Sequence, residues 1–145
     1  MFHLEMSSTG YHLPVLLHDC INGLLIDSSG IYVDVTFGGG GHSRAILEKL
    51  ISGRLIAFDQ DVDALQNVPE DDKFTLVPQN FKYLKNNLRL LGCKQVNGVL
   101  GDLGVSSHQF DIPDRGFSMR FDADLDMRMD QRSKLTASII LNEYS

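Results

Sequence analysis

Hydrophobic residues occur in short runs, separated by polar segments rich in Gly, Pro, Asn and Asp. Four runs are dominated by aliphatic and β-branched residues, and runs of this length predict buried strands. They cover residues 31–36, 54–59, 73–77 and 97–103. Before and between them, apolar positions three to four residues apart predict helices. These helices are expected within residues 12–26, with Pro14 in the first turn, and over 42–50, 61–68 and 81–92.

This alternation of helix and strand predicts the fold class. Strands that alternate with helices through short loops form a parallel sheet with right-handed crossovers. We therefore predict an α/β fold with a doubly wound, Rossmann-like sheet. Such sheets bind ligands at the carboxyl ends of their strands, and the unusual features of this sequence all follow a predicted strand. They are Gly38–Gly41, Asp59, Asn80 with Phe81, and Asp102 with the residues after it.

The segment DVTFGGGGHS places four glycines directly after the first predicted strand. Glycine is costly to order, so either the chain makes a tight crossover or a ligand lies against bare backbone at a helix N-terminus. An acidic residue about 20 positions further on, at the end of the second strand, is typical of ribose recognition. Asp59 lies 21 positions after Gly38 and fits this role.

The details of the loop indicate which ligand it suits. In a dinucleotide fingerprint, G-x-G-x-x-G, the last position is glycine, but counting from Gly38 or Gly39 gives Ser43 or Arg44 there. The sequence also lacks the G-x-x-x-x-G-K-[ST] motif of phosphate-binding loops. A glycine turn and a ribose-binding acid without a pyrophosphate signature favour an adenosine ligand that lacks phosphates, such as S-adenosylmethionine.

Three polar residues near this edge have more than one interpretation. His42 either contacts the ligand or caps the turn. Asp102 either is a solvated carboxylate at a strand end or accepts hydrogen bonds from a ligand amine or a nucleophile. His108, a single histidine in a loop, is expected to take no part in chemistry.

Residues 104–130 show no clear periodicity and are rich in Asp and Arg. The spacing of Asp122, Asp124 and Asp126 does not make an EF-hand, because Met127 and Ser133 stand where Gly and Glu are needed. The segment is either a solvated loop whose charges pair with one another, or a surface that offers arginines to RNA phosphates. The arginines are Arg115, Arg120 and Arg128.

Composition adds bounds on location and partners. The net charge of −6 gives no general attraction to a polyanion, so any contact with nucleic acid depends on local arginines or on residues outside the chain. Cys20 and Cys93 are not in a C-x-x-C pair and are expected to be reduced and buried. We find no signal-peptide pattern and no apolar run near 18 residues, so we expect a cytoplasmic location without a membrane span.

Several segments together resemble the MraW/RsmH family of bacterial S-adenosylmethionine-dependent methyltransferases. They are HLPVLL, DVTFGGGGHS, AFDQD, NFKYL, DLGVSSHQFD, RGFSMR and LDMRMD, spread over residues 12–130. The resemblance implies a class I methyltransferase fold with sheet order 3-2-1-4. It also implies methylation of the exocyclic N4 of a cytosine in small-subunit ribosomal RNA.

The resemblance further implies which residues bind S-adenosylmethionine. Gly40, Gly41 and His42 would contact it from the loop, Asp59 would hold the ribose, and Phe81 would flank the adenine. Asp102 and Gln109 would complete the pocket. Two positions depart from the family pattern, since His108 stands where Pro is usual and Gly101 where a larger aliphatic residue is common. No catalytic residue is assigned, although Asp102 or nearby carbonyls could accept the amine hydrogens of the cytosine.

The resemblance also predicts the domain organisation. Residues 1–130 would be the N-terminal part of the cofactor-binding domain, and residues 131–145 the start of an inserted helical domain. Family members are about twice as long, so we expect a fragment that is inactive alone, with the RNA platform outside it. A fourth strand without a neighbour would leave a hydrophobic sheet edge through which a homodimer could form. The alternatives are an NAD-dependent oxidoreductase and a non-catalytic nucleotide-binding module.

Overall fold

The computed structural model describes residues 14–144. His12 and Leu13 of the first predicted helical segment, and Ser145, lie outside the described residues. The elements in chain order are α1 (Leu17–Gly23), β1 (Ile31–Asp34), α2 (Gly41–Leu47), β2 (Arg54–Phe58), the 3₁₀ helix η1 (Val62–Asn67), β3 (Phe74–Val77), the 3₁₀ helix η2 (Phe81–Tyr83), α3 (Leu84–Leu90), β4 (Gly98–Leu100), α4 (Ser107–Asp111), the 3₁₀ helix η3 (Pro113–Arg115) and α5 (Ala137–Glu143).

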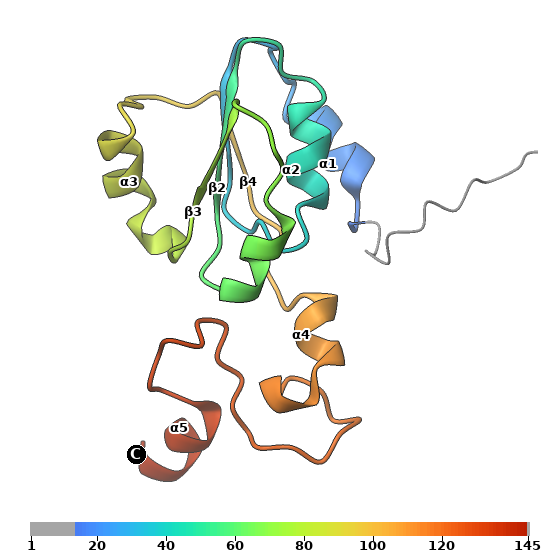
Figure 1. Cartoon of the computed structure of the whole chain (residues 1–145), viewed down its shortest axis with the longest axis vertical. Coiled ribbons are helices and arrows are strands. Elements are labelled where there is room, and N and C mark those ends of the chain that lie inside the picture. Colours follow the sequence, from blue (N-terminus) through green and yellow to red (C-terminus); the bar gives the residue numbers. More distant parts are fainter. Residues whose placement is uncertain (1–13, 145) are drawn as a thin grey trace, which may run out of the picture.

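The four strands form one sheet in the order β3-β2-β1-β4, and every neighbouring pair is parallel. This confirms the predicted doubly wound sheet and its order. Helices α1 and α2 lie on one side of the sheet and α3 lies on the other (Figure 1). The parallel arrangement brings all four carboxyl ends to one edge, where ligands of such sheets bind.

Each face of the sheet has its own hydrophobic cluster, because successive strand residues point to opposite sides. On the first face, Tyr32 and Leu55 pack with Ile46, Leu47 and Leu50 from and just after α2. On the second face, four buried strand side chains pack against three half-buried leucines from and just after α3. The strand residues are Val33, Ile56, Phe58 and Val77, and the leucines are Leu84, Leu88 and Leu91.

The N-terminal helix differs from its prediction. It begins at Leu17 rather than near Pro14, and Leu16 before it adopts a left-handed conformation with φ of 55°. Val15, Leu16 and Leu25 are exposed, while Ile21 and Leu24 pack against the sheet. The apolar spacing therefore predicted the helix but not its ends, and of its apolar positions 15, 16, 21, 24 and 25 only Ile21 and Leu24 face the core.

The chain after β4 is more ordered than its sequence pattern indicated. It contains α4 and η3, and the next helix, α5, begins at Ala137 with Thr136 as its cap, within the part of the chain (131–145) that is expected to begin a helical domain. This part of the chain lies beyond the carboxyl ends of the strands, below the sheet in Figure 1. It is therefore placed to cover the edge where the predicted site residues gather.

Candidate functional site at the carboxyl ends of the strands

The glycine loop joins β1 to α2 in a conformation that other residues adopt only with strain. Gly38 and Gly40 have φ of 49° and 75°, in the left-handed region. A Cβ atom at Gly40 would lie 2.9 Å from the Phe37 ring, and one at Gly41 would overlap the Pro14 side chain. The turn itself therefore requires at least Gly38 and Gly40, and Pro14 packing explains Gly41.

Asp59, directly after β2, is bonded to this loop. Its Oδ2 accepts a hydrogen bond from the Gly38 N–H at 2.7 Å, and its Oδ1 accepts one from the Asp61 N–H at 2.9 Å. Each carboxylate oxygen can accept a further bond. Burial raises the pKa of Asp59, and these backbone bonds only partly offset that effect. The structure thus joins the two features that the sequence places 21 positions apart.

The ends of β1 and β4 are connected through a fully buried carboxylate. Asp34, the last residue of β1, accepts hydrogen bonds from Ser43 Oγ at 2.7 Å and from the Thr36 N–H at 3.0 Å. Thr36 Oγ1 in turn accepts the Asp102 N–H at 2.8 Å. Burial raises the pKa of Asp34 despite these bonds. Thr36 therefore fixes the backbone at Asp102, whose own side chain remains 55% exposed.

His42 is buried in the first turn of α2, with 6% of its surface exposed. Its Nδ1 lies 4.0 Å from Asp102 Oδ2, so the structure brings these two predicted site residues together. Its Nε2 is buried and has no hydrogen-bond partner among residues 14–144. An unsatisfied buried polar atom costs about 1–3 kcal/mol. A polar ligand group that reached this nitrogen would remove that cost.

The backbone at Phe81 is held near Asp59 by a hydrogen bond between the neighbours of these two residues, Asn80 and Gln60. Asn80 caps η2 and donates a hydrogen bond from Nδ2 to Gln60 Oε1 at 2.7 Å. Phe81 is the first residue of η2, and its side chain is 41% exposed. An aromatic side chain that is free on one face is able to stack on a base.

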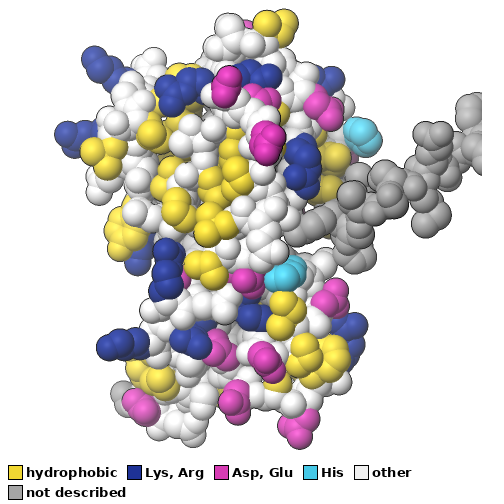
Figure 2. All heavy atoms as spheres, in the orientation of Figure 1, with side chains coloured by type: hydrophobic (Ala, Val, Ile, Leu, Met, Phe, Trp, Pro, Cys, Tyr) yellow, Lys and Arg dark blue, Asp and Glu magenta, His cyan; other side chains and the backbone are white. Residues whose placement is uncertain are grey.

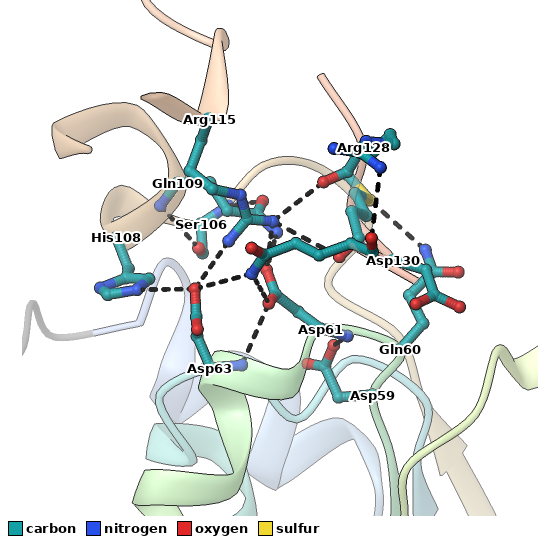
Figure 3. A network of polar contacts seen from close by, with 12 residues as sticks. Asp59, Gln60, Asp61, Asp63, Ser106, His108, Gln109, Arg115, Arg128 and Asp130 are labelled. Carbon is teal, nitrogen blue, oxygen red and sulfur yellow. Dashed lines mark hydrogen bonds and ion pairs between the residues drawn. The ribbon is translucent and has the colours of Figure 1, made fainter. Parts of the chain in front are cut away.

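Gln109 reaches the same loop from the opposite direction. It lies in the capping box of α4, where its Oε1 accepts the Ser106 N–H and its own N–H is bonded to Ser106 Oγ. Its Nε2 donates to Asp61 Oδ2 at 2.7 Å (Figure 3). The side chain is therefore fixed in place, and its amide nitrogen is engaged by protein rather than free.

Arg115 completes this network and is 5% exposed. Its guanidinium donates to Asp61 Oδ2 at 2.6 Å and to Asp63 Oδ2 at 2.8 Å, and it also bonds the Arg128 carbonyl at 2.9 Å. Burial tends to raise the pKa of Asp61, but the bonds from Arg115 and Gln109 outweigh it and hold that pKa below its usual range. The network fastens η3 and α4 to the chain after β2 (Figure 3).

These contacts decide between the two interpretations of the Asp- and Arg-rich segment. Arg115 is buried, Arg128 pairs with Asp126, and Arg120 pairs with Asp111. The self-paired interpretation is therefore confirmed for Arg120 and Arg128. Arg115 pairs instead with Asp61 and Asp63, which lie outside the segment, and its interpretation as a phosphate ligand is wrong. His108 Nε2 lies 3.2 Å from Asp63 Oδ2 at the exposed margin of the network.

Sequence reasoning missed the residues that connect the site. Thr36, Gln60 and Asp61 were not singled out, although each stands within or beside a segment that was. The spacing Ser106-x-x-Gln109 is a capping-box signature and could have been used to find α4. Within residues 14–144, no group of His, Cys, Asp and Glu could hold a metal ion. No helix among them is long and apolar enough to cross a membrane.

In the comparison with known proteins, the matching family model and the similar relatives point to the same family. The family model described as the MraW methylase family matches residues 9–145. The Ribosomal RNA small subunit methyltransferase H of Christiangramia forsetii is 62% identical, over 92% of this chain and 45% of its own length. The protein of the same name from Flavobacterium johnsoniae is 61% identical, over 92% of this chain and 45% of its own length. The chain thus spans slightly under half the length of these relatives.

A solved structure adds a weaker likeness. The crystal structure of an rRNA methylase from Streptococcus thermophilus matches 57% of this chain and 51% of its own, with 23% identity and a TM-score of 0.42.

Proposed function

The chain belongs to the MraW methylase family, and from this premise we propose that the protein containing it methylates ribosomal RNA. The proposed reaction transfers the methyl group of S-adenosylmethionine to the exocyclic N4 of a cytosine in the small-subunit RNA. Relatives that are 61% and 62% identical are named small-subunit ribosomal RNA methyltransferases, which supports the substrate class.

One observation carries the cofactor assignment. The Asp59 carboxylate is bonded to the Gly38 N–H at 2.7 Å, so a ribose-binding acid and a glycine turn form a single unit at the strand ends. This is the arrangement that sheets of this class use for adenosine ligands. The lack of a pyrophosphate fingerprint favours S-adenosylmethionine over a dinucleotide.

We assign the pocket to the seven residues predicted from the family. Gly40, Gly41 and His42 would contact the ligand from the loop, and Asp59 would accept from its ribose hydroxyls. The remaining three come from η2, from the chain after β4 and from α4. They are Phe81, which would flank the adenine, and Asp102 and Gln109, which would close the pocket.

The chemistry that these residues must support is an in-line displacement. The N4–C bond forms as the sulfonium S–C bond breaks, the sulfur keeps the bonding pair, and the amine releases a proton. The N4 lone pair is conjugated into the ring, so alignment within about 3–3.5 Å of the methyl carbon is the main requirement. The target base must also leave its stack to reach the pocket. Asp102 or nearby carbonyls would accept the amine hydrogens.

The domain organisation remains part of this proposal. Residues 1–130 would belong to the cofactor domain, and residues 131–145 would begin an inserted helical domain that presents RNA. Among residues 14–144, β4 pairs only with β1, and Val99 on it is 49% exposed, so this edge could also join two copies of the chain. Light scattering of the chain at increasing concentration would test this; a constant monomer mass would rule the dimer out.

The cofactor is tested by calorimetry on the protein encoded by the whole reading frame. We expect S-adenosylmethionine and S-adenosylhomocysteine to bind, and NAD not to bind. Asp59→Asn should weaken S-adenosylmethionine binding about ten- to a hundred-fold, because bonds to a charged acceptor contribute about 1.5–3 kcal/mol. Asp72→Asn is the matched control, since Asp72 is exposed and should leave affinity unchanged.

The substrate is tested by incubating the same protein with S-adenosylmethionine labelled in its methyl group and with small ribosomal subunits. Label in N4-methylcytosine would support the proposed reaction. Unlabelled RNA would favour a binding module, and binding of NAD alone would favour an oxidoreductase.

A further inference from the structure

One segment of this acidic chain carries Lys and Arg residues without any acidic residue among them. Residues 73–101 contain no Asp or Glu but five Lys or Arg, while the chain as a whole has a net charge of −6. Lys73 is neutralised, since its Nζ lies 3.3 Å from Asp71 Oδ2 and also bonds the Leu50 carbonyl. The remaining four are Lys82, Lys85, Arg89 and Lys94, and all are exposed.

Three of these charges lie along one helical stripe. Lys82, Lys85 and Arg89 follow each other at intervals of three and four residues, which places them on one face of η2 and α3. Leu84, Leu88 and Leu91 pack against the sheet on the opposite side, so the stripe faces solvent. Figure 2 shows Lys and Arg side chains along the left edge of the molecule, where Figure 1 places α3.

None of the three forms an ion pair with any residue of 14–144. In this they differ from Arg120, Arg128 and Arg132 after β4, which pair with Asp111, Asp126 and Asp130. Tyr83 lies within the same stretch, 47% exposed, with Lys82 Nζ 4.9 Å from its ring centre. We call Lys82, Tyr83, Lys85 and Arg89 the α3 surface.

The α3 surface begins at the candidate site. Phe81 precedes Lys82, and Asn80 before it bonds Gln60, the residue next to Asp59. From there the stripe extends along α3, away from the strand ends. If the target nucleotide of an RNA reaches the strand ends, the phosphates of the neighbouring nucleotides would therefore lie close to these cations.

We propose that the α3 surface binds the phosphate backbone of the RNA substrate. Unpaired Lys and Arg release counterions from a polyanion, which gives a favourable and salt-dependent contribution to binding. An exposed tyrosine next to them offers a stacking face to an unpaired base. The inference rests on the proposed function for the identity of the RNA, and it explains how a chain with net negative charge contacts RNA.

The test compares two double variants with the same change of charge. Lys85→Glu with Arg89→Glu alters the α3 surface, whereas Lys49→Glu with Arg54→Glu alters exposed residues just after α2 and at the start of β2. Both are made in the protein encoded by the whole reading frame. Binding of a fluorescein-labelled hairpin from small-subunit RNA is followed by anisotropy over a range of salt concentrations, and S-adenosylmethionine binding by calorimetry.

We expect the α3 variant to lose at least about ten-fold in RNA affinity at low salt, with the slope of log K against log salt reduced by about 1–2. The control should change much less, and both should bind S-adenosylmethionine as the parent does. Equal losses in the two variants, or no RNA binding by the parent, would overturn the proposal. If the parent binds RNA but transfers no methyl group, a loss of RNA affinity in the α3 variant alone would support the role of the α3 surface and contradict the proposed reaction.

Discussion

At the scale of single residues, Arg115 is a charged side chain whose ion pairs hold η3 and α4 in place. Its guanidinium is buried between Asp61 and Asp63, and Asp61 donates its N–H to the Asp59 carboxylate. Arg115 is thus linked through Asp61 to Asp59, the residue proposed to hold ribose. Removing one partner of a buried pair leaves an uncompensated charge, whereas an exposed pair contributes little.

We predict that Arg115→Ala lowers the free energy of unfolding by about 3–5 kcal/mol, because Asp61 would remain buried and unpaired. Arg115→Lys should restore little of this, since an ammonium group cannot reproduce the forked contacts to two carboxylates. Arg120→Ala is the matched control, with an expected loss of at most about 1 kcal/mol, because its pair with Asp111 is exposed. Urea unfolding measures all three, and equal losses for Arg115 and Arg120 would contradict the buried-clamp role.

Site residues were predictable from the sequence where the fold alone determines their neighbours. The coupling of Gly38 and Asp59 follows from their places after adjacent parallel strands, and the structure joins them at 2.7 Å. Arg115 could not be placed this way. Its partner Asp61 is 54 positions away, and nothing local distinguishes an arginine that pairs with a buried acid from one that binds phosphate.

At the scale of elements, the turns that connect strands and helices depend on close backbone approach. Gly53, between α2 and β2, lies so near the Gly30 backbone that a Cβ atom there would overlap the Gly30 carbonyl. The same turn donates three N–H groups, from residues 51–53, to the Ser28 carbonyl. This contact joins the start of β1 to the start of β2 and helps set their register.

Gly53→Ala is therefore expected to destabilise the protein by about 1–3 kcal/mol, because the backbone at Gly30 must move. Gly23→Ala provides the comparison, since a Cβ atom at Gly23 meets nothing within 4 Å. As Gly23 ends helix α1, alanine there should be neutral or stabilise by up to about 1 kcal/mol. Thermal unfolding of both variants tests the difference, and a neutral Gly53→Ala would show that the turn can relax.

Elements were predictable in proportion to their burial. The strands were found because most of their side chains are buried or half-buried, and their ends differ from the prediction by at most three residues. β4 was predicted over 97–103 but spans Gly98–Leu100, where it pairs with β1 alone. α4 has only 5 residues, too few to show a helical period, so its capping box was the one local signal.

At the scale of the whole molecule, the alternation of strands and helices predicted a parallel, doubly wound sheet, while the order β3-β2-β1-β4 was predicted only through the family resemblance. The position of the segment after β4 was not predictable. It is held against the strand ends by polar contacts to Asp61 and Asp63, and hydrophobic periodicity carries no information about such contacts. Among the described residues, the carboxylates of Asp34 in the sheet and Asp61 beneath this segment are both buried, but their surroundings shift their pKa values in opposite directions.

These environments give the stability of the molecule two opposing dependences on pH. Burial raises the pKa of Asp34 above its unfolded value of about 4, so its favourable contribution is complete below that pH and is lost as the pH rises. The pKa of Asp61 is lowered, because the bonds from Arg115 and Gln109 outweigh burial. Its contribution is therefore present above about pH 4 and is lost as the pH falls.

The difference in unfolding free energy between each Asn variant and the parent should then change in opposite directions. As the pH rises from about 4 to about 7, Asp34→Asn should gain stability relative to the parent, whereas Asp61→Asn should lose stability relative to the parent as the pH rises from about 2 to about 5. Urea unfolding at several pH values in constant salt measures both, and using differences from the parent cancels the titration of the other acids. Parallel pH profiles for the two variants would mean that Asp34 is ionised in the folded protein as readily as Asp61, and that its hydrogen bonds from Ser43 and Thr36 fully compensate for burial.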